Sequence, residues 1–152
     1  MNLKDIMIDK LIYIEEKVFT KQDVFTFLTE KIARLKGVNE DLLLNAVNKR
    51  ENKLTTAIGL NVAIPHARIK NWGKTTMACL KTKEVKNYES MDSKPVKLVF
   101  LFISDSNKPG EHVNVMSKLS YILAEDDNID KLLNTKSSEE LFNSIIEISN
   151  AM

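Results

Sequence analysis

The sequence predicts an α/β fold in which a layer of strands packs against helices. Segments with apolar residues at helical spacing alternate along the chain with short apolar runs rich in β-branched residues. The run VKLVFLFI, residues 96–103, is interrupted only by Lys97 and is typical of a central strand covered on both faces. No repeat, low-complexity tract or Gly/Pro-rich linker divides the chain, so residues 1–152 are expected to form a single domain.

Two helices are predicted in the first third of the chain. The segment TKQDVFTFLTEKIARLKG, residues 20–37, can be capped by Thr20, with Asp23 placed for a weak capping box and Gly37 as a stop. Its expected apolar stripe is Val24, Phe27, Leu28, Ile32 and Leu35. Asn39 can cap a second helix that runs to about Arg50 or Glu51. The expected apolar stripe of that helix is Leu42, Leu43, Ala46 and Val47.

Strand patterns follow the helices. NVAIP, residues 61–65, is short and apolar, and Pro65 is expected to close it. TTMACL, residues 75–80, is a second strand that contains Cys79 as a small buried side chain. SDSNKPGE, residues 104–111, is a predicted loop between the strand at 96–103 and an amphipathic helix from His112 to Leu123. A last helix, SSEELFNSIIEI at 137–148, begins with a capping box formed by Ser137 and Glu140.

Composition excludes several classes of protein. The chain has 22 Lys and Arg against 21 Asp and Glu, a net charge of +1 with no basic block, so no affinity for nucleic acid is expected. A single cysteine excludes an internal disulfide and favours a reducing, cytoplasmic setting. No signal peptide or membrane insertion is expected, because Asp5 and Asp9 interrupt the apolar N-terminal segment.

The motifs for cofactors are also missing from the sequence. The chain lacks glycine-rich nucleotide loops, a Gly-x-Ser-x-Gly elbow, and the histidine or cysteine spacing of a zinc site. We therefore expect neither a cofactor nor a metal ion.

His66 is the main candidate for chemistry. It follows an apolar run and Pro65, at the expected carboxyl end of a strand, which is where ligands bind in open α/β sheets. A neutral imidazole held there by the backbone would be a good nucleophile, although a histidine filling a half-buried turn is an equal alternative.

Three further residues could assist such a nucleophile. Arg50 and Arg68 carry guanidinium groups whose geometry matches phosphoryl oxygens, although solvated surface arginines are common. His112 opens a predicted helix, whose N-terminus favours anions and would lower the pKa of the ring. Taken alone, His112 is more simply a surface loop residue.

The segment AIGLNVAIPHARI resembles the phosphorylation site of enzyme IIA domains of the bacterial phosphotransferase system, fructose/mannitol class. The family pattern includes Arg-Glu, a Ser/Thr pair, glycine and V-A-I-P-H, matched here by Arg50-Glu51, Thr55-Thr56, Gly59 and residues 62–66. TKQDVFTFLTEK, MDSKPVKLVFLFI, PGEHVNVMSKLSYIL and SSEELFNSII are similar to further family segments, in the same order. The expected fold is then a mixed central β-sheet with helices on both faces.

The resemblance implies a phosphocarrier. His66 would accept a phosphoryl group on Nε2 from a phosphorylated HPr-type protein, with Arg50 and His112 flanking it and a backbone carbonyl accepting from Nδ1. The group would pass to an enzyme IIB, or the phosphorylation state would act as a signal to regulatory targets. PHAR and SSEEL look more like the nitrogen-regulatory branch; the alternatives are a fructose/mannitol-type transport relay and a protein-binding module without phosphotransfer.

The sequence departs from the family pattern around its second glycine. Asn61 stands in that place and can adopt a positive φ, so the same turn is expected. Leu60 would place an apolar side chain near the mouth of the site. Leu60 and Val113 are candidates for an apolar docking patch.

Overall fold

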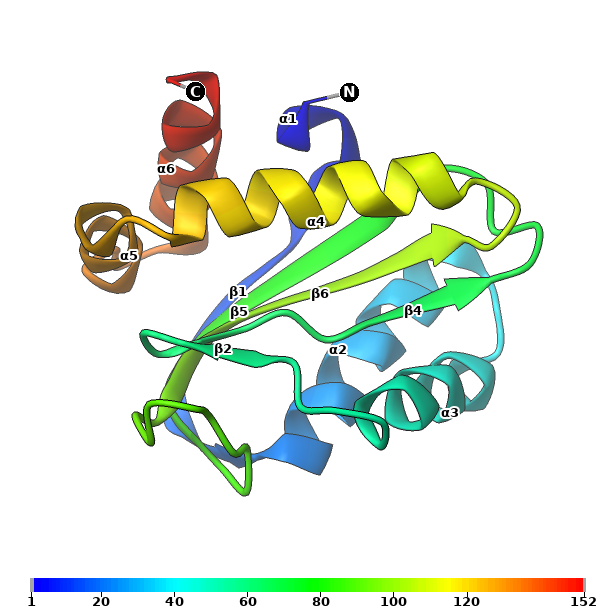
Figure 1. The fold of residues 1–152 in the computed structure, drawn as a ribbon, viewed down its shortest axis with the longest axis horizontal. Helices are drawn as coiled ribbons and strands as arrows, with labels where there is room; N and C mark the ends of the chain where they lie inside the picture. Colours follow the sequence, from blue (N-terminus) through cyan, green and yellow to red (C-terminus); the bar gives the residue numbers. More distant parts are fainter. Residues whose placement is uncertain (1, 152) are drawn as a thin grey trace.

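The sheet of six strands forms the middle layer of the molecule. The computed structural model describes residues 2–151, and within them the strand order is β1-β5-β6-β3-β2, with β4 also paired to β6 (Figure 1). The strands are β1 (Met7–Thr20), β2 (Ala57–Gly59), β3 (Val62–Ala63), β4 (His66–Ile69), β5 (Thr76–Lys86) and β6 (Val96–Asp105). β1 pairs parallel with β5, β3 and β4 pair parallel with β6, and the β5–β6 and β2–β3 pairs are antiparallel. The sheet is therefore mixed, as predicted.

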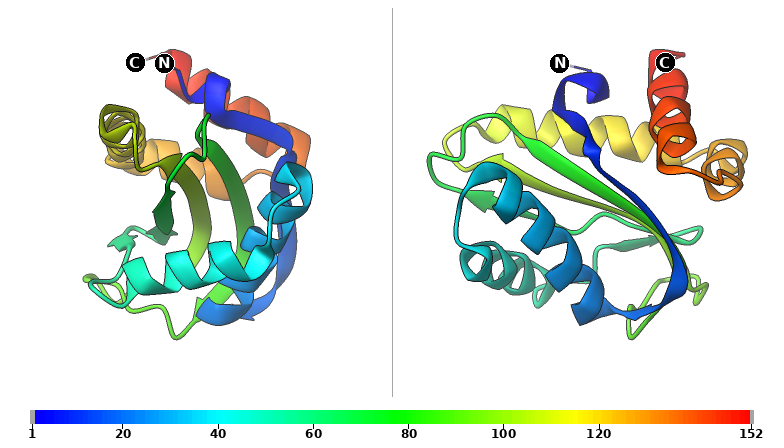
Figure 2. Two further views of the ribbon diagram at one scale, coloured as in Figure 1. Left: turned by 90° about the vertical axis from the view of Figure 1, so that its right-hand side faces the viewer. Right: turned by 180° about the vertical axis from the view of Figure 1, so that it is seen from behind.

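Helices cover both faces of this sheet, again as predicted. They are α1 (Leu3–Ile6), α2 (Lys21–Lys36), α3 (Glu40–Glu51), α4 (Pro109–Leu123), α5 (Asp126–Leu133) and α6 (Ser138–Asn150). α2 and α3 lie on one face, and α4, α5 and α6 lie on the other (Figures 1 and 2). No helix within residues 2–151 is long and apolar enough to cross a membrane.

β6 joins the two halves of the core. Alternate side chains of a strand point to opposite faces. Leu98, Phe100 and Phe102 accordingly pack with the α4–α6 side, and Val99, Leu101 and Ile103 pack with the α2–α3 side. Every residue of β6 except Lys97 is buried, which confirms the prediction of a central strand.

Most of the predicted helix ends are confirmed, but the stripes differ in part. Thr20 and Asp23 form the capping box of α2, Gly37 ends the helix with φ 69°, and Asn39 caps α3. Leu35 and Leu42, assigned to the apolar stripes, are 44% and 53% exposed. Phe25 is buried in place of Leu35, because the face of α2 that contacts the sheet is rotated by one position.

At the last helix, the predicted capping box is wrong in one half. Ser137 caps α6 by accepting from the Glu140 backbone N–H, but the Glu140 side chain accepts from the Lys136 backbone N–H instead of from Ser137.

Several predicted element boundaries are also wrong: β5 extends to Lys86 and β6 to Asp105, beyond the predicted ends at residues 80 and 103. α4 begins at Pro109, one turn before His112, because proline at the first helical positions needs no hydrogen-bond partner for its nitrogen. The strand expected to close at Pro65 resumes at His66 as β4, because the Pro65 carbonyl accepts from Phe102 N at 3.1 Å and continues the pairing with β6.

Candidate functional site

His66 lies at the first position of β4 and is held by the main chain. Its Nδ1 is 2.8 Å from the carbonyl oxygen of Ile64. A carbonyl can only accept a hydrogen bond, so Nδ1 carries the hydrogen and Nε2 keeps an unprotonated lone pair in the neutral ring. His66 thus begins a strand and does not end one, contrary to the expectation, and only 7% of the residue is exposed.

Two aromatic rings fix the plane of the His66 imidazole. Phe102, its register partner on β6, stacks on it with centroids 5.2 Å apart and planes 19° apart. The His112 ring stands edge-on, with centroids 5.0 Å apart and planes at 65°. The fully buried Phe102 also lies 5.2 Å from His112, so one phenyl ring supports both histidines. The sequence-predicted pair His66 and His112 is therefore brought together.

His112 is oriented by a side chain that the sequence analysis did not single out. Its Nδ1 lies 2.7 Å from the hydroxyl of Ser104, near the end of β6. Burial is the largest cause that lowers the pKa of His112 from 6.5 to about 4, followed by the positive charges of Arg68 and of the other site groups. The ring is therefore neutral near pH 7. The expected place of His112 at a helix N-terminus predicted the direction of this pKa shift, but its largest cause is burial and not the helix dipole.

Both histidines open onto one cavity, which we call the histidine cavity. It has a volume of about 490 Å³ and is lined by Ala46, Lys49, Arg50, Lys53, His66, Ala67, Arg68 and His112. Its lining thus combines two imidazoles with four cationic side chains and no carboxylate. Such a lining suits a compact anion with several oxygens.

Arg50 reaches the histidine cavity from the last turn of α3. Its Nη1 donates to the carbonyl oxygen of Leu54 at 2.8 Å, which fixes one side of the guanidinium group. Arg68 comes from β4, two positions after His66, so period-2 geometry directs both side chains to the same face. The structure brings Arg50, Arg68 and both histidines together.

Burial and the nearby charges favour an unprotonated His66 ring. Burial is the largest cause that lowers the pKa of His66, and Arg50 and Arg68 lower it further. The hydrogen bond to Ile64 and the negative charge of Glu51 act in the opposite direction but do not reverse the shift. A buried neutral imidazole with a free Nε2 can attack an electrophile and can become an anionic phosphohistidine beside cations.

Some site residues escaped the sequence analysis, and one expectation is wrong. Phe102 lay unnoticed in the apolar run 96–103, and Ser104 lay unnoticed at the start of the predicted loop 104–111. Lys49 and Lys53, spaced four apart, carried only the weak signal of two lysines flanking Arg50. Leu60 does not lie at the site mouth: it lines a separate hollow with Asn61, Lys94, Asp126, Ile129 and Asp130. Leu60 and Asn61 both have positive φ, 56° and 72°, which confirms the expected turn.

The site shows no metal-binding arrangement in the part of the chain that the structure describes. No cluster of three or more His, Cys, Asp or Glu side chains there could hold a metal ion. Cys79 is buried in β5, and burial raises the pKa of its thiol well above the ordinary value, as suits a core side chain.

A family model and a similar sequence from another organism point to the same protein family. Residues 5–148 match the family described as "Phosphoenolpyruvate-dependent sugar phosphotransferase system, EIIA 2". The sequence is 31% identical over 140 residues to the fructose-specific EIIA component of Haloferax volcanii, covering 91% of each chain.

Solved structures share the fold. The nitrogen regulatory protein IIA-Ntr of Neisseria meningitidis superimposes with a TM-score of 0.87 and 26% identity, over 94% of this chain and 98% of the other. The complex of enzyme IIAMTL and phosphorylated enzyme IIBMTL from Escherichia coli matches with a TM-score of 0.71 and 19% identity, over 97% and 100%.

Proposed function

Because this chain belongs to the EIIA 2 family of the phosphoenolpyruvate-dependent sugar phosphotransferase system, we propose that it is a phosphocarrier, acting as a single domain through a phosphohistidine at His66. The observation that carries the proposal is the bond from His66 Nδ1 to the Ile64 carbonyl, which leaves Nε2 as the nucleophile. The donor is a phosphorylated HPr-type carrier protein.

The transfer exchanges one phosphorus–nitrogen bond for another. The lone pair of His66 Nε2 attacks the phosphorus in line with the donor nitrogen, the donor P–N bond breaks, and its electron pair returns to the donor imidazole. No proton has to leave His66 during the attack, because the hydrogen stays on Nδ1, which donates it to the Ile64 carbonyl. The reaction then depends mainly on alignment and on stabilising the charge of the phosphoryl oxygens.

Arg50 and His112 are the proposed stabilising residues. Arg50 keeps guanidinium N–H donors beyond the one bound to Leu54, and it lines the same cavity as His66. If Ser104 donates to His112 Nδ1, the His112 Nε2–H becomes a neutral donor toward the phosphoryl oxygens. Arg68 adds a third donor group from β4.

The acceptor that follows is an enzyme IIB or a regulatory target. Support for an enzyme IIB comes from the IIAMTL–IIBMTL complex, in which a protein of this fold meets its phosphorylated partner. Support for a nitrogen-regulatory role, which we favour, comes from the TM-score of 0.87 with IIA-Ntr, against 0.71 for IIAMTL. The 31% identity to a fructose-specific EIIA supports the second candidate, a fructose-type transport relay.

The test is phosphorylation with phosphoenolpyruvate, enzyme I and HPr. We expect one acid-labile, base-stable phosphoryl group per chain, located at His66, and no label on a His66→Ala variant. Label on His66→Ala would refute the assignment of the nucleophile. Subsequent addition of an enzyme IIB domain separates the roles, because a transport relay passes its label to IIB at a physiological rate and a dedicated regulator retains it.

A further inference from the structure

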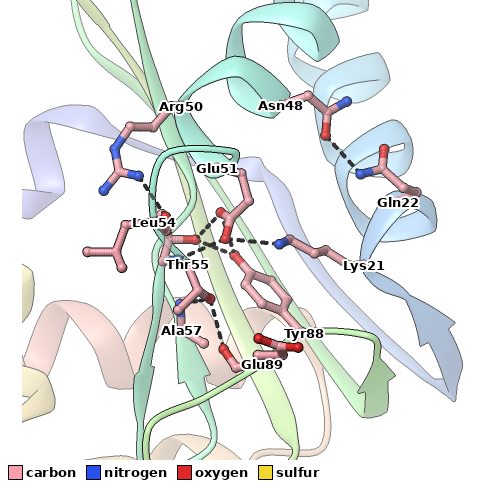
Figure 3. Close-up of polar contacts among 11 residues, drawn as sticks. Lys21, Gln22, Asn48, Arg50, Glu51, Leu54, Thr55, Ala57, Tyr88 and Glu89 are labelled. Carbon is pink, nitrogen blue, oxygen red and sulfur yellow. Dashed lines mark hydrogen bonds and ion pairs between the residues drawn. The ribbon is translucent and has the colours of Figure 1, made fainter.

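A buried carboxylate that the proposed transfer does not use lies next to Arg50 in the chain. Glu51 is the last residue of α3, and its side chain is only 3% exposed. It contacts Lys21, Thr56 and Tyr88, and we call these four residues the Glu51 cluster (Figure 3). Figure 3 shows Arg50 and Glu51 leaving the end of α3 in different directions.

Both carboxylate oxygens of Glu51 have partners. Oε2 accepts from the Thr56 backbone N–H at 2.9 Å and lies 3.1 Å from the Lys21 ammonium. Oε1 accepts from the Thr56 hydroxyl at 2.6 Å and lies 3.4 Å from the Tyr88 hydroxyl. Because Thr56 gives its only hydroxyl hydrogen to Glu51, Tyr88 is the donor in its own contact with Thr56 Oγ1. Burial raises the pKa of Tyr88, which keeps that hydroxyl protonated.

These contacts close the turn that connects α3 to β2. Glu51 directly precedes the turn at residues 52–56, and Thr56 is its last residue. The Glu51 side chain therefore joins the two ends of the turn. Thr55 adds a second attachment through its hydroxyl, which donates to the Glu89 carbonyl at 2.8 Å. Inside the closed turn lies Leu54, whose carbonyl oxygen accepts from Arg50 Nη1.

We propose that Glu51 is a positioning residue for phosphoryl transfer: by closing the turn at 52–56 it holds the Leu54 carbonyl, and through it the Arg50 guanidinium, at the histidine cavity. The proposal rests on the phosphocarrier function proposed above. Glu51 does not line the histidine cavity, so it acts through Arg50 and not on the phosphoryl group.

A purely electrostatic role predicts a different outcome. The negative charge of Glu51 raises the pKa of His66, so removing the charge would lower that pKa further and keep the ring unprotonated at pH 7. Charge removal alone would therefore leave the nucleophile available. A slower phosphoryl transfer in a neutral variant of Glu51 would therefore report that the Arg50 guanidinium is no longer held in position.

The experiment is a double-mutant cycle between Arg50→Ala and Glu51→Gln, with kcat/KM measured for phosphoryl uptake from phosphorylated HPr. Removing a group that donates a hydrogen bond to the transition-state charge lowers kcat/KM about 100-fold, and misplacing such a group is expected to lower kcat/KM about 10-fold. Because Glu51 acts through Arg50, the double variant should be no slower than Arg50→Ala. The ¹H–¹⁵N heteronuclear NOE of Arg50 Nε should also fall toward values of a mobile side chain in Glu51→Gln.

Asp92→Asn is the matched control. Asp92 accepts from the Leu60 and Lys94 backbone N–H groups and from Ser90, and so fixes a different loop that carries no residue of the histidine cavity. Its uptake rate should equal that of the wild type. If Glu51→Gln does not fold, Thr56→Val removes the hydroxyl of the cluster and is judged by the same criteria.

The outcomes separate this proposal from the proposed function. Failure of the wild type to take up a phosphoryl group would refute the phosphocarrier itself. A wild-type rate in Glu51→Gln, or a double variant slowed by the product of both single effects, would overturn the positioning role and leave the phosphocarrier intact.

Discussion

Replacing His112 by asparagine should make the stability of the protein less dependent on pH. Asparagine retains a polar atom near the position of Nδ1 for Ser104 but cannot be protonated. Burial lowers the pKa of His112 from 6.5 to about 4, so the folded state binds a proton less readily than the unfolded state. The free energy of unfolding is therefore unaffected by this group well above pH 6.5, and it decreases as the pH falls from 6.5 toward 4. Between pH 7.5 and pH 5, this difference in pKa corresponds to about 2 kcal/mol.

Urea unfolding at both pH values tests this magnitude. With a slope of roughly 2 kcal/mol per M, the wild-type midpoint should fall by about 1 M more than that of His112→Asn. Arg50, Arg68 and His66, which face the ring, are present in both proteins, so the comparison isolates the His112 proton. Midpoints that fall equally in the two proteins would refute the statement that His112 is neutral because it is buried.

Three other variants follow from the site and its surroundings. Ser104→Ala removes the partner of His112 Nδ1 and should slow phosphoryl uptake about 10-fold without abolishing it; an unchanged rate in a stopped-flow assay would remove Ser104 from the site. Lys49→Gln combined with Lys53→Gln should lower kcat/KM several-fold at low salt, with a difference that disappears near 0.5 M salt, roughly where exposed charges are screened; a salt-independent loss would argue against a role in electrostatic attraction. Gly59→Ala should destabilise the protein by about 1–2 kcal/mol, because Gly59 has φ 92° and a Cβ would lie 3.2 Å from Asp92; Gly110→Ala, with open space around it, is the control, and equal thermal unfolding temperatures would contradict the reasoning.

Sequence patterns predicted the elements that have capping side chains or a long apolar run. α2 and α3 have side-chain caps, and β6 is apolar on both faces, so their positions depend on local chemistry and burial. β1 was missed, although it pairs with β5 over most of its length. It is an edge strand with two register shifts, and Asp9, Lys10 and Glu16 break the alternation that marks a strand. α5 was also missed. It has only eight residues, begins with Asp126, Asp127 and Asn128, and lacks a capping side chain.

The site was predictable where the family motif covers it and hidden where tertiary structure assembles it. Residue chemistry offered Arg50 and His112 as possible partners of His66, and the resemblance to the family implied that the three residues flank one site. Their proximity depends on the parallel pairing of β4 with β6 and on α4 following β6, which no local pattern encodes. Phe102 and Ser104 occupy alternate positions of one strand, and only the register of that strand places them beneath the two histidines.

The two imidazoles differ in how they are held, and this difference has an evolutionary consequence. The tautomer of His66 is set by a peptide carbonyl, which every amino acid supplies, so a substitution at position 64 preserves the proposed nucleophile as long as the backbone path survives. The orientation of His112 depends on the hydroxyl of Ser104, which a single codon change can delete. Selection can therefore tune the rate of the proposed transfer at position 104 while the proposed reactivity of His66 remains protected.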